Sequence, residues 1–313
     1  MQFANQFVDE RALHNNCSAR TDQVCIAAPA KINLYLGVFP HSSHQHGYHK
    51  VDTLMAAVEL FDWVHLACVS SARANTVAMT PSFDVDPSEN IALVAADRMC
   101  DAFHRAHTIS IEIEKHILPQ SGLGGSSSDA AAVIRGLCAL WQIDPLDDRV
   151  VMIARSIGAD VAFFLDPRPS FMQGVGNERI HSYALTHPIY CALIRPTQGQ
   201  STPEAYRIFD QAPIAPASPQ SLLAAVALAD VHAISQHVYN NLAAALLAVD
   251  SELARVQNWI AQQPETLGCL LSGSGTAFFA LCETKESADR LAIRAEKMMK
   301  WWTDSTQVLG MRA

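Results

Sequence analysis

The sequence has no apolar run long enough to cross a membrane. Its longest runs, Leu222–Ala229 and Leu242–Val249, are far shorter than the roughly 20 residues that a bilayer-spanning helix needs. A dense basic run is also missing, and 22 basic against 31 acidic residues give a formal net charge of -9. This balance argues against a broad nucleic-acid surface. We therefore expect a small-molecule substrate, and neither a membrane nor a nucleic acid as a partner.

Paired-cysteine and metal-ligand patterns are absent as well. The eight cysteines include no Cys-x-x-Cys pair, and several lie in apolar runs such as Leu137–Leu140. They are typical of reduced core residues in a cytoplasmic protein. The histidines from His41 to His49 lack zinc-ligand spacing, which favours a solvated loop. Residues 1–22 lack the apolar stretch of a signal peptide, and we expect a loosely ordered extension there.

Half of the 313 residues are apolar, so the chain can bury a substantial core in one large or two moderate domains. The composition changes near residue 185, where we place a domain boundary, and we find no internal repeats. Hydrophobic periodicity predicts strands over 51–64, 107–114 and 189–195, and helices over 90–106, 150–156, 219–229, 240–250, 251–263 and 285–301.

One stretch, Leu118–Ala130, is suited to binding an anion. It joins the strand over 107–114 to an apolar-faced helix that we expect to begin near Ser127. A helix start offers unpaired N–H groups and a positive dipole end, and glycines let the backbone approach a phosphate. Asp129 is placed to cap the first turn. The alternative is a tight turn with an ordinary serine cap. Neither the Walker A nor the Rossmann spacing is present, so a cation must come from elsewhere.

Two further residues stand out. Lys31 alternates with apolar residues in a strand candidate after Pro29 and shares a face with Asn33. Asp160 lies between a glycine turn and an aromatic run. The plain alternatives are a solvated edge lysine and a helix N-cap aspartate.

Three stretches, Pro29–Leu34, 122–130 and Leu271–Thr276, together resemble the ordered motifs of the galactokinase, homoserine kinase, mevalonate kinase and phosphomevalonate kinase superfamily. Gly47–His49, Gly158–Val161 and Ser201–Tyr206 resemble the branch of it whose acceptor is a cytidine-linked methylerythritol. The resemblance implies a two-domain α+β fold with an active site in the cleft. It implies a nucleotide-binding, catalytic domain over 23–185 and a smaller, substrate-binding domain over 186–313.

The resemblance also implies roles for individual residues. Members bind ATP and magnesium and phosphorylate a hydroxyl. Lys31 and Asp160 match the catalytic pair, and Tyr206 stands where relatives carry an aromatic against cytosine. The ATP cradle would comprise Gly122, Leu123, Gly124, Gly125, Ser126, Ser127 and Ser128, with magnesium held through the ATP phosphates and Ser127. The substrate contacts would be Asn33, Tyr48, His49, Thr202 and Tyr206.

The sequence departs from the superfamily pattern at three positions. Gln120 and Ser126 stand where glycine is usual, and Asp129 stands where asparagine is common. Two alternatives stay open: a sister kinase of the mevalonate or homoserine type, and a nucleotide-binding regulator without catalysis. We expect a monomer or a weak homodimer.

Overall fold

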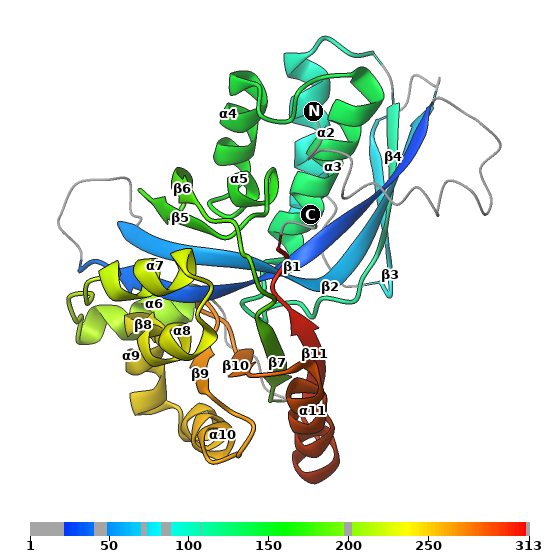
Figure 1. The fold of residues 1–313 in the computed structure, drawn as a ribbon. Helices are drawn as coiled ribbons and strands as arrows, with labels where there is room; N and C mark the ends of the chain where they lie inside the picture. The colour runs from blue at the N-terminus through cyan, green and yellow to red at the C-terminus, as the bar shows by residue number, and fades with distance from the viewer. Residues whose placement is uncertain are drawn as a thin grey trace. The chain divides into compact units, whose positions relative to one another are not determined.

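The computed structural model describes residues 22–40, 49–69, 74–82, 89–106, 108–196 and 202–310. The chain forms two compact units, each assembled from separate segments. The first comprises Met1–Ala30, Phe61–Pro119 and Gly124–Asp166, and the second comprises Lys31–Leu60, Gln120–Leu123 and Pro167–Ala313. The long strands β1 (Gln23–Val38) and β2 (Val51–Val69) pair with each other (Figure 1). Each of them is divided between the two units, after Ala30 in β1 and after Leu60 in β2.

The first unit combines a sheet with a layer of helices. Its other elements are β3 (Thr76–Thr80), α2 (Ile91–Ala102), β4 (Thr108–Glu114), α3 (Gly125–Trp141), α4 (Asp148–Ile157) and α5 (Val161–Phe164). The second part of β2 pairs antiparallel with β4, which pairs parallel with β3. Helix α3 packs on α2 and α5. The strand that the sequence predicts before the glycine stretch is β4, and the helix after it begins two residues earlier than Ser127.

The second unit contains the rest of the chain. Its other elements are β5 (Ser170–Gln173), β6 (Glu178–Ser182), β7 (Tyr190–Arg195), α6 (Thr202–Gln211), α7 (Gln220–Ala227), α8 (Val231–His237), β8 (Tyr239–Asn240), α9 (Asn241–Val249), α10 (Ser251–Ala261), β9 (Gly268–Leu271), β10 (Phe278–Cys282), α11 (Lys285–Met299) and β11 (Trp302–Gln307). The second part of β1 pairs parallel with β8, and the first part of β2 pairs antiparallel with β5. A separate antiparallel sheet has the order β11-β7-β10-β9.

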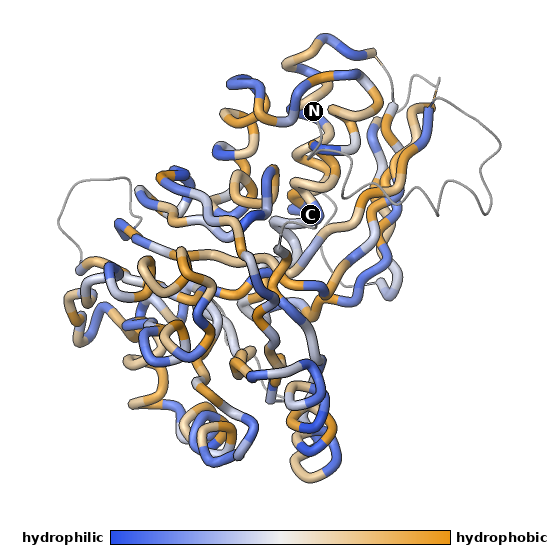
Figure 2. Tube along the Cα trace, viewed as in Figure 1, coloured by the Kyte–Doolittle hydropathy of each residue, from blue (hydrophilic) through white to orange (hydrophobic). Residues whose placement is uncertain are grey.

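The main core of the second unit lies between this four-stranded sheet and helices α6, α9, α10 and α11. Apolar and polar residues alternate along α11 (Figure 2). Its buried residues are Ala288, Leu291, Ala292 and Ala295, which lie at helical spacing and form one apolar stripe. Among the described residues, no helix is both long and apolar enough to cross a membrane.

Most predicted elements are present, but their ends differ. Helix α2 ends at Ala102 instead of reaching 106, because His104 adopts a left-handed conformation (φ 51°) that stops the helix. Lys300, with φ 59°, ends α11 in the same way. The sequence analysis did not foresee β3, α6, α8, β8 or β11. The three strands are short or polar, and their pairing partners are distant in sequence. The two helices are short, so local periodicity carries little signal for them.

Candidate active site

Lys31 lies at the start of a buried chain of hydrogen bonds in the second unit. Its Nζ donates to Asn33 Oδ1 at 2.5 Å, and Asn33 Nδ2 donates to Thr53 Oγ1 at 2.9 Å. Thr53 Oγ1 in turn donates to a backbone carbonyl of β1 at 2.7 Å. Lys31 is only 4% exposed and Asn33 only 3%. The alternative of a solvated edge lysine is therefore wrong, and the ammonium is held in a defined orientation.

The three stretches that carried the resemblance meet around this lysine. The backbone N–H of Lys31 donates to Leu123 O at 2.9 Å, and Ser272 Oγ donates to Gly122 O at 3.1 Å. The contact is too close for side chains at the glycines: a Cβ on Gly122 would lie 2.1 Å from Ser272 O, and one on Gly273 would lie 3.2 Å from Lys31 Nζ. The sequence analysis recognised Leu271–Thr276 as a motif but assigned none of its residues to the site, although the signal was present.

The predicted phosphate cradle continues in the first unit at the start of α3. Gly124 is the N-cap and is left-handed (φ 75°), so no capping side chain covers the first turn. The first N–H groups of a helix have no intrahelical acceptor and carry the positive end of its dipole. Ser126 is exposed and Ser127 is half-buried. Ser128 is buried, and its Oγ has no hydrogen-bond partner in the structure. This arrangement fits a bound phosphate, and the cradle assignment stays a prediction.

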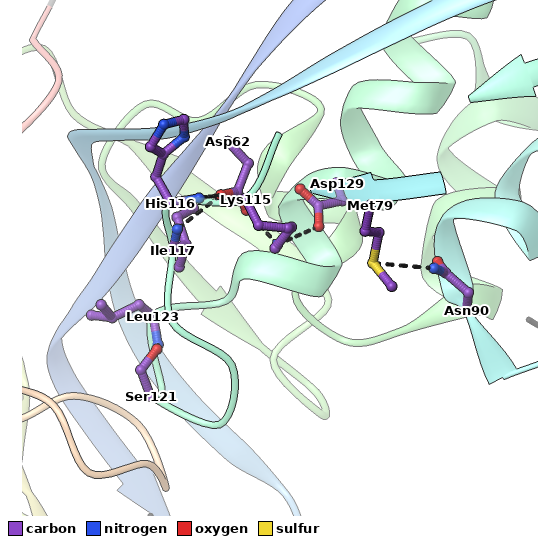
Figure 3. A network of polar contacts seen from close by, with 9 residues as sticks. All are labelled: Asp62, Met79, Asn90, Lys115, His116, Ile117, Ser121, Leu123 and Asp129. Carbon is purple, nitrogen blue, oxygen red and sulfur yellow. Dashed lines mark hydrogen bonds and ion pairs between the residues drawn. The ribbon is translucent and has the colours of Figure 1, made fainter. Parts of the chain in front are cut away.

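Asp129 does not cap α3, contrary to the sequence-based expectation, because the helix begins at Gly125 and Asp129 is its fifth residue. Its side chain belongs instead to a buried ion cluster (Figure 3). Lys115 Nζ lies 2.6 Å from Asp129 Oδ2 and also pairs with Asp62. Asp62 accepts two further hydrogen bonds, from the N–H groups of His116 and Ile117 at 2.5 and 2.8 Å. Asp129 Oδ1 has no hydrogen-bond partner. One ammonium therefore pairs with two buried carboxylates, of which Asp62 accepts more hydrogen bonds than Asp129 does.

Burial and ion pairing shift the pKa values of Asp129 and Lys115 in this cluster. Burial raises the pKa of Asp129 well above its ordinary value, and the attraction of Lys115 offsets this only in part. Burial also lowers the pKa of Lys115, but its attraction to Asp129 and Asp62 outweighs burial and the net shift is upward. The ammonium thus stays charged, and Asp129 gains a proton more readily than an ordinary aspartate does.

Replacing Asp129 by asparagine should make the stability of the protein less sensitive to pH. Because Asp129 holds its proton more tightly when folded, its contribution favours the folded state at low pH and is lost as pH rises through the raised pKa. The melting temperature of Asp129→Asn minus that of wild type should therefore become more positive from about pH 4 to about pH 8. Thermal melts across this range test the expectation. A difference that is constant with pH would contradict it.

Asp160 stands immediately before α5 in the first unit and is half-buried. Asp160 is the N-cap residue of α5, but its side chain makes no capping hydrogen bond to that helix. Lys31 belongs to the second unit. The pairing of Lys31 with Asp160 stays a prediction.

The predicted substrate contacts His49 and Tyr206 lie together in the second unit. Their rings stack, with centroids 5.2 Å apart and planes at 26°. His49 Nδ1 lies 3.0 Å from Phe39 O, and His49 Nε2 lies 3.1 Å from Asp210 Oδ1. His49 is buried, so the prediction of a solvated loop is wrong at its last residue. The sequence analysis missed Asp210, which lies one helical turn from Tyr206 on the same face of α6.

Two other predicted substrate contacts are not described by the structure. Tyr48 lies outside the described residues. Thr202 begins α6, and its side chain likewise lies outside what the structure describes. Their roles stay predictions.

The comparison with known proteins decides the family. A protein of Desulfitobacterium hafniense (strain Y51) named 4-diphosphocytidyl-2-C-methyl-D-erythritol kinase is 31% identical over 291 residues, which cover 92% of this chain and 98% of the relative. The chain belongs to the 4-diphosphocytidyl-2-C-methyl-D-erythritol kinase family. A relative of the same name from Methylacidiphilum infernorum (isolate V4) is 33% identical and covers 81% of this chain and 84% of its own length.

Structural comparison agrees with membership of this kinase family. A crystal structure of 4-(cytidine 5'-diphospho)-2C-methyl-D-erythritol kinase matches with a TM-score of 0.73 and 31% identity over 91% of this chain and 100% of that chain. A homoserine kinase from Cytophaga hutchinsonii shares the fold, with a TM-score of 0.72 at 18% identity over 94% of this chain and 97% of that chain. The models of the GHMP kinases N terminal domain and the GHMP kinases C terminal region match residues 90–166 and 222–300.

These matches confirm the predicted α+β GHMP kinase architecture. The boundary near residue 185 falls between the two matched regions and stays a prediction.

Proposed function

We propose that this kinase transfers the γ-phosphoryl group of ATP to the C2 hydroxyl of 4-diphosphocytidyl-2-C-methyl-D-erythritol, a step of non-mevalonate isoprenoid precursor biosynthesis. The observation that carries the proposal is the convergence of three distant stretches on the buried ammonium of Lys31. Phosphoryl transfer asks a protein mainly for positioning and for neutralisation of charge. A fixed ammonium beside a glycine-rich backbone supplies both.

Each candidate residue has a distinct part in this reaction. The N–H groups at the start of α3 and the hydroxyls of Ser126 and Ser127 bind the triphosphate. Magnesium, when bound with ATP, neutralises phosphate charge, and Ser127 is its candidate protein ligand. Lys31 offsets the charge on the transferred group, and Asp160 accepts the proton of the acceptor hydroxyl. The fixed position of Lys31 keeps this charge in place throughout the transfer.

The cytidine part of the substrate requires recognition far from the reacting hydroxyl. Tyr206 offers an aromatic face, and Tyr48 is a second aromatic candidate. The nitrogens of His49 lie against Phe39 O and Asp210 Oδ1, so His49 would exchange one of these partners for the cytosine when the substrate binds. The stacking of His49 on Tyr206 supports a shared recognition surface.

Replacing Tyr206 by alanine should weaken binding of the cytidine substrate and leave ATP binding unchanged. A base stacked on an aromatic contributes about 1 to 3 kcal/mol, which corresponds to an increase of about 5- to 150-fold in KM. Tyr206→Phe is the matched control, because it keeps the ring and should keep KM. A lower melting temperature with an unchanged KM would show instead that Tyr206 acts only in packing.

One assay tests the proposed activity itself. ADP release from ATP and magnesium is measured with the cytidine substrate, mevalonate and homoserine in parallel. We expect turnover with the cytidine substrate alone. Turnover with mevalonate or homoserine would identify a sister kinase, and no turnover with any substrate would indicate a nucleotide-binding regulator.

The cellular location and the oligomeric state of the enzyme are part of the same proposal. We propose a cytoplasmic location, which the free thiols of all seven described cysteines support. A monomer or weak homodimer stays a prediction, and analytical ultracentrifugation would test it.

A further inference from the structure

Asn240 lies where β8 meets α9, and its side chain is almost completely buried. Its Oδ1 accepts a hydrogen bond from Ala243 N at 3.0 Å and caps α9. Its Nδ2 donates to Leu271 O at 3.0 Å and to Gly273 O at 2.9 Å. One acceptor and two donors on a short side chain are what a primary amide provides. Aspartate would keep the cap but lose both donors.

The two carbonyls that Asn240 binds belong to the turn after β9. We call residues Ser272–Gly275 the glycine turn. Gly273 has a left-handed conformation with φ 63°, and Gly275 N donates back to Ser272 O at 3.4 Å, so the turn has a specific shape. Asn240 binds the residue before the turn and the second residue in it. It therefore fixes the turn at the point where the backbone changes direction.

The glycine turn contacts the site on two sides. Gly273 lies against the side chains of Lys31 and Asn33, since a Cβ there would be 3.2 Å from Lys31 Nζ and from Asn33 Oδ1. Ser272 binds Gly122 O, which belongs to the predicted triphosphate cradle. A shift of the turn would therefore move a wall of the lysine site and a backbone segment of the cradle together.

We propose that Asn240 is a positioning residue for phosphoryl transfer, which holds the glycine turn against Lys31 and Gly122; this rests on the proposed function of that site. It acts through the turn and not by contact with the reacting groups. Its loss should lower turnover, because a misplacement of about 1 Å near the chemistry can cost about 100-fold in rate.

The neighbouring residue Asn241 provides a matched control. Its side chain is equally buried, and it also makes three hydrogen bonds to backbone groups: it accepts from Val38 N at 2.9 Å and donates to Val38 O at 2.7 Å and to Ile214 O at 2.8 Å. None of these groups belongs to the glycine turn. Asn240→Asp and Asn241→Asp therefore remove the same chemistry at adjacent positions.

The experiment compares both variants with wild type in two measurements, well below their melting temperatures. In Asn240→Asp, kcat should fall by about 10- to 100-fold while KM for the cytidine substrate is kept. Hydrogen exchange of the segment 268–277 should accelerate. Asn241→Asp should show neither change, although its melting temperature also falls. Should Asn240→Asp fail to fold, Asn240→Ser keeps a good N-cap and takes its place.

Two results would overturn the proposal. One is equal loss of kcat in the Asn240 and Asn241 variants, which would indicate general destabilisation. The other is unchanged exchange of residues 268–277 in the folded Asn240 variant. Exchange needs no substrate, so it tests whether Asn240 holds the glycine turn even if wild type does not turn over the cytidine substrate. Absence of turnover by wild type would refute the proposed function, and this result is independent of the exchange measurement.

Discussion

Turnover of Asp160→Asn is expected to fall by about two to four orders of magnitude, the usual range for loss of a general base. The substitution keeps the shape of the side chain but removes the proton acceptor. Lys31→Ala should lose a similar amount, because it leaves charge on the transferred phosphoryl group uncompensated. Single-turnover phosphorylation with saturating ATP measures both. Asp148→Asn, at an exposed carboxylate of α4, is the matched control and should retain wild-type turnover.

The double variant tests whether Lys31 and Asp160 work together. Groups that act as a unit give losses that do not multiply, so the double variant should be little slower than the slower single variant. Losses that multiply would show that the two residues act independently. In that case the ammonium would have a role in phosphate binding alone.

Gly122→Ala is expected to have the second largest effect, on both stability and turnover. A Cβ at Gly122 would lie 2.1 Å from Ser272 O and 2.9 Å from Gly275 N, and both are backbone atoms that cannot rotate away. The glycine turn must therefore move away from the cradle. We expect the free energy of unfolding to fall by about 2 to 4 kcal/mol and turnover to fall by about 100-fold.

Gly176→Ala separates this collision from backbone strain. Gly176 also has a left-handed conformation, with φ 91° against 79° for Gly122, but the nearest atom to its Cβ is 4.0 Å away. Both variants therefore carry a strain of about 1 to 2 kcal/mol, and only Gly122→Ala adds the collision. Urea unfolding and kcat of the two variants measure the difference. Equal effects would show that the close approach of the glycine turn is not required.

The parts of the site that follow from local patterns could be predicted from the sequence. Strand alternation places Lys31 and Asn33 on one face, and the structure joins them directly. A glycine before an apolar-faced helix predicts an anion-binding helix start, and α3 begins there. In both cases the pattern involves residues only two to four positions apart in the sequence, so the sequence alone reveals it.

The parts that were missed depend on contacts between distant segments. Asp62 meets Lys115 because β2 pairs with β4, and that register cannot be obtained from either strand alone. The same reason explains why Asp129 was expected to be a cap, since its partner lies outside its own helix. Asn240 reaches carbonyls more than 30 residues along the chain. A polar residue in a short strand gives no indication of such a role.

The segmented construction of the second unit has a consequence for protein synthesis. Its strand partners are far apart: Leu309 N donates to Ala57 O, and Tyr239 pairs with Tyr35. At about 5 to 20 residues per second, Leu309 is translated on the order of 10 to 50 s after Ala57. All three segments of the first unit lie before Pro167, so they are synthesised before the last segment of the second unit is complete. A premature stop near residue 185 would therefore release a chain that has every segment of the first unit but lacks β8, so the edge of β1 that pairs with β8 would be open to other chains.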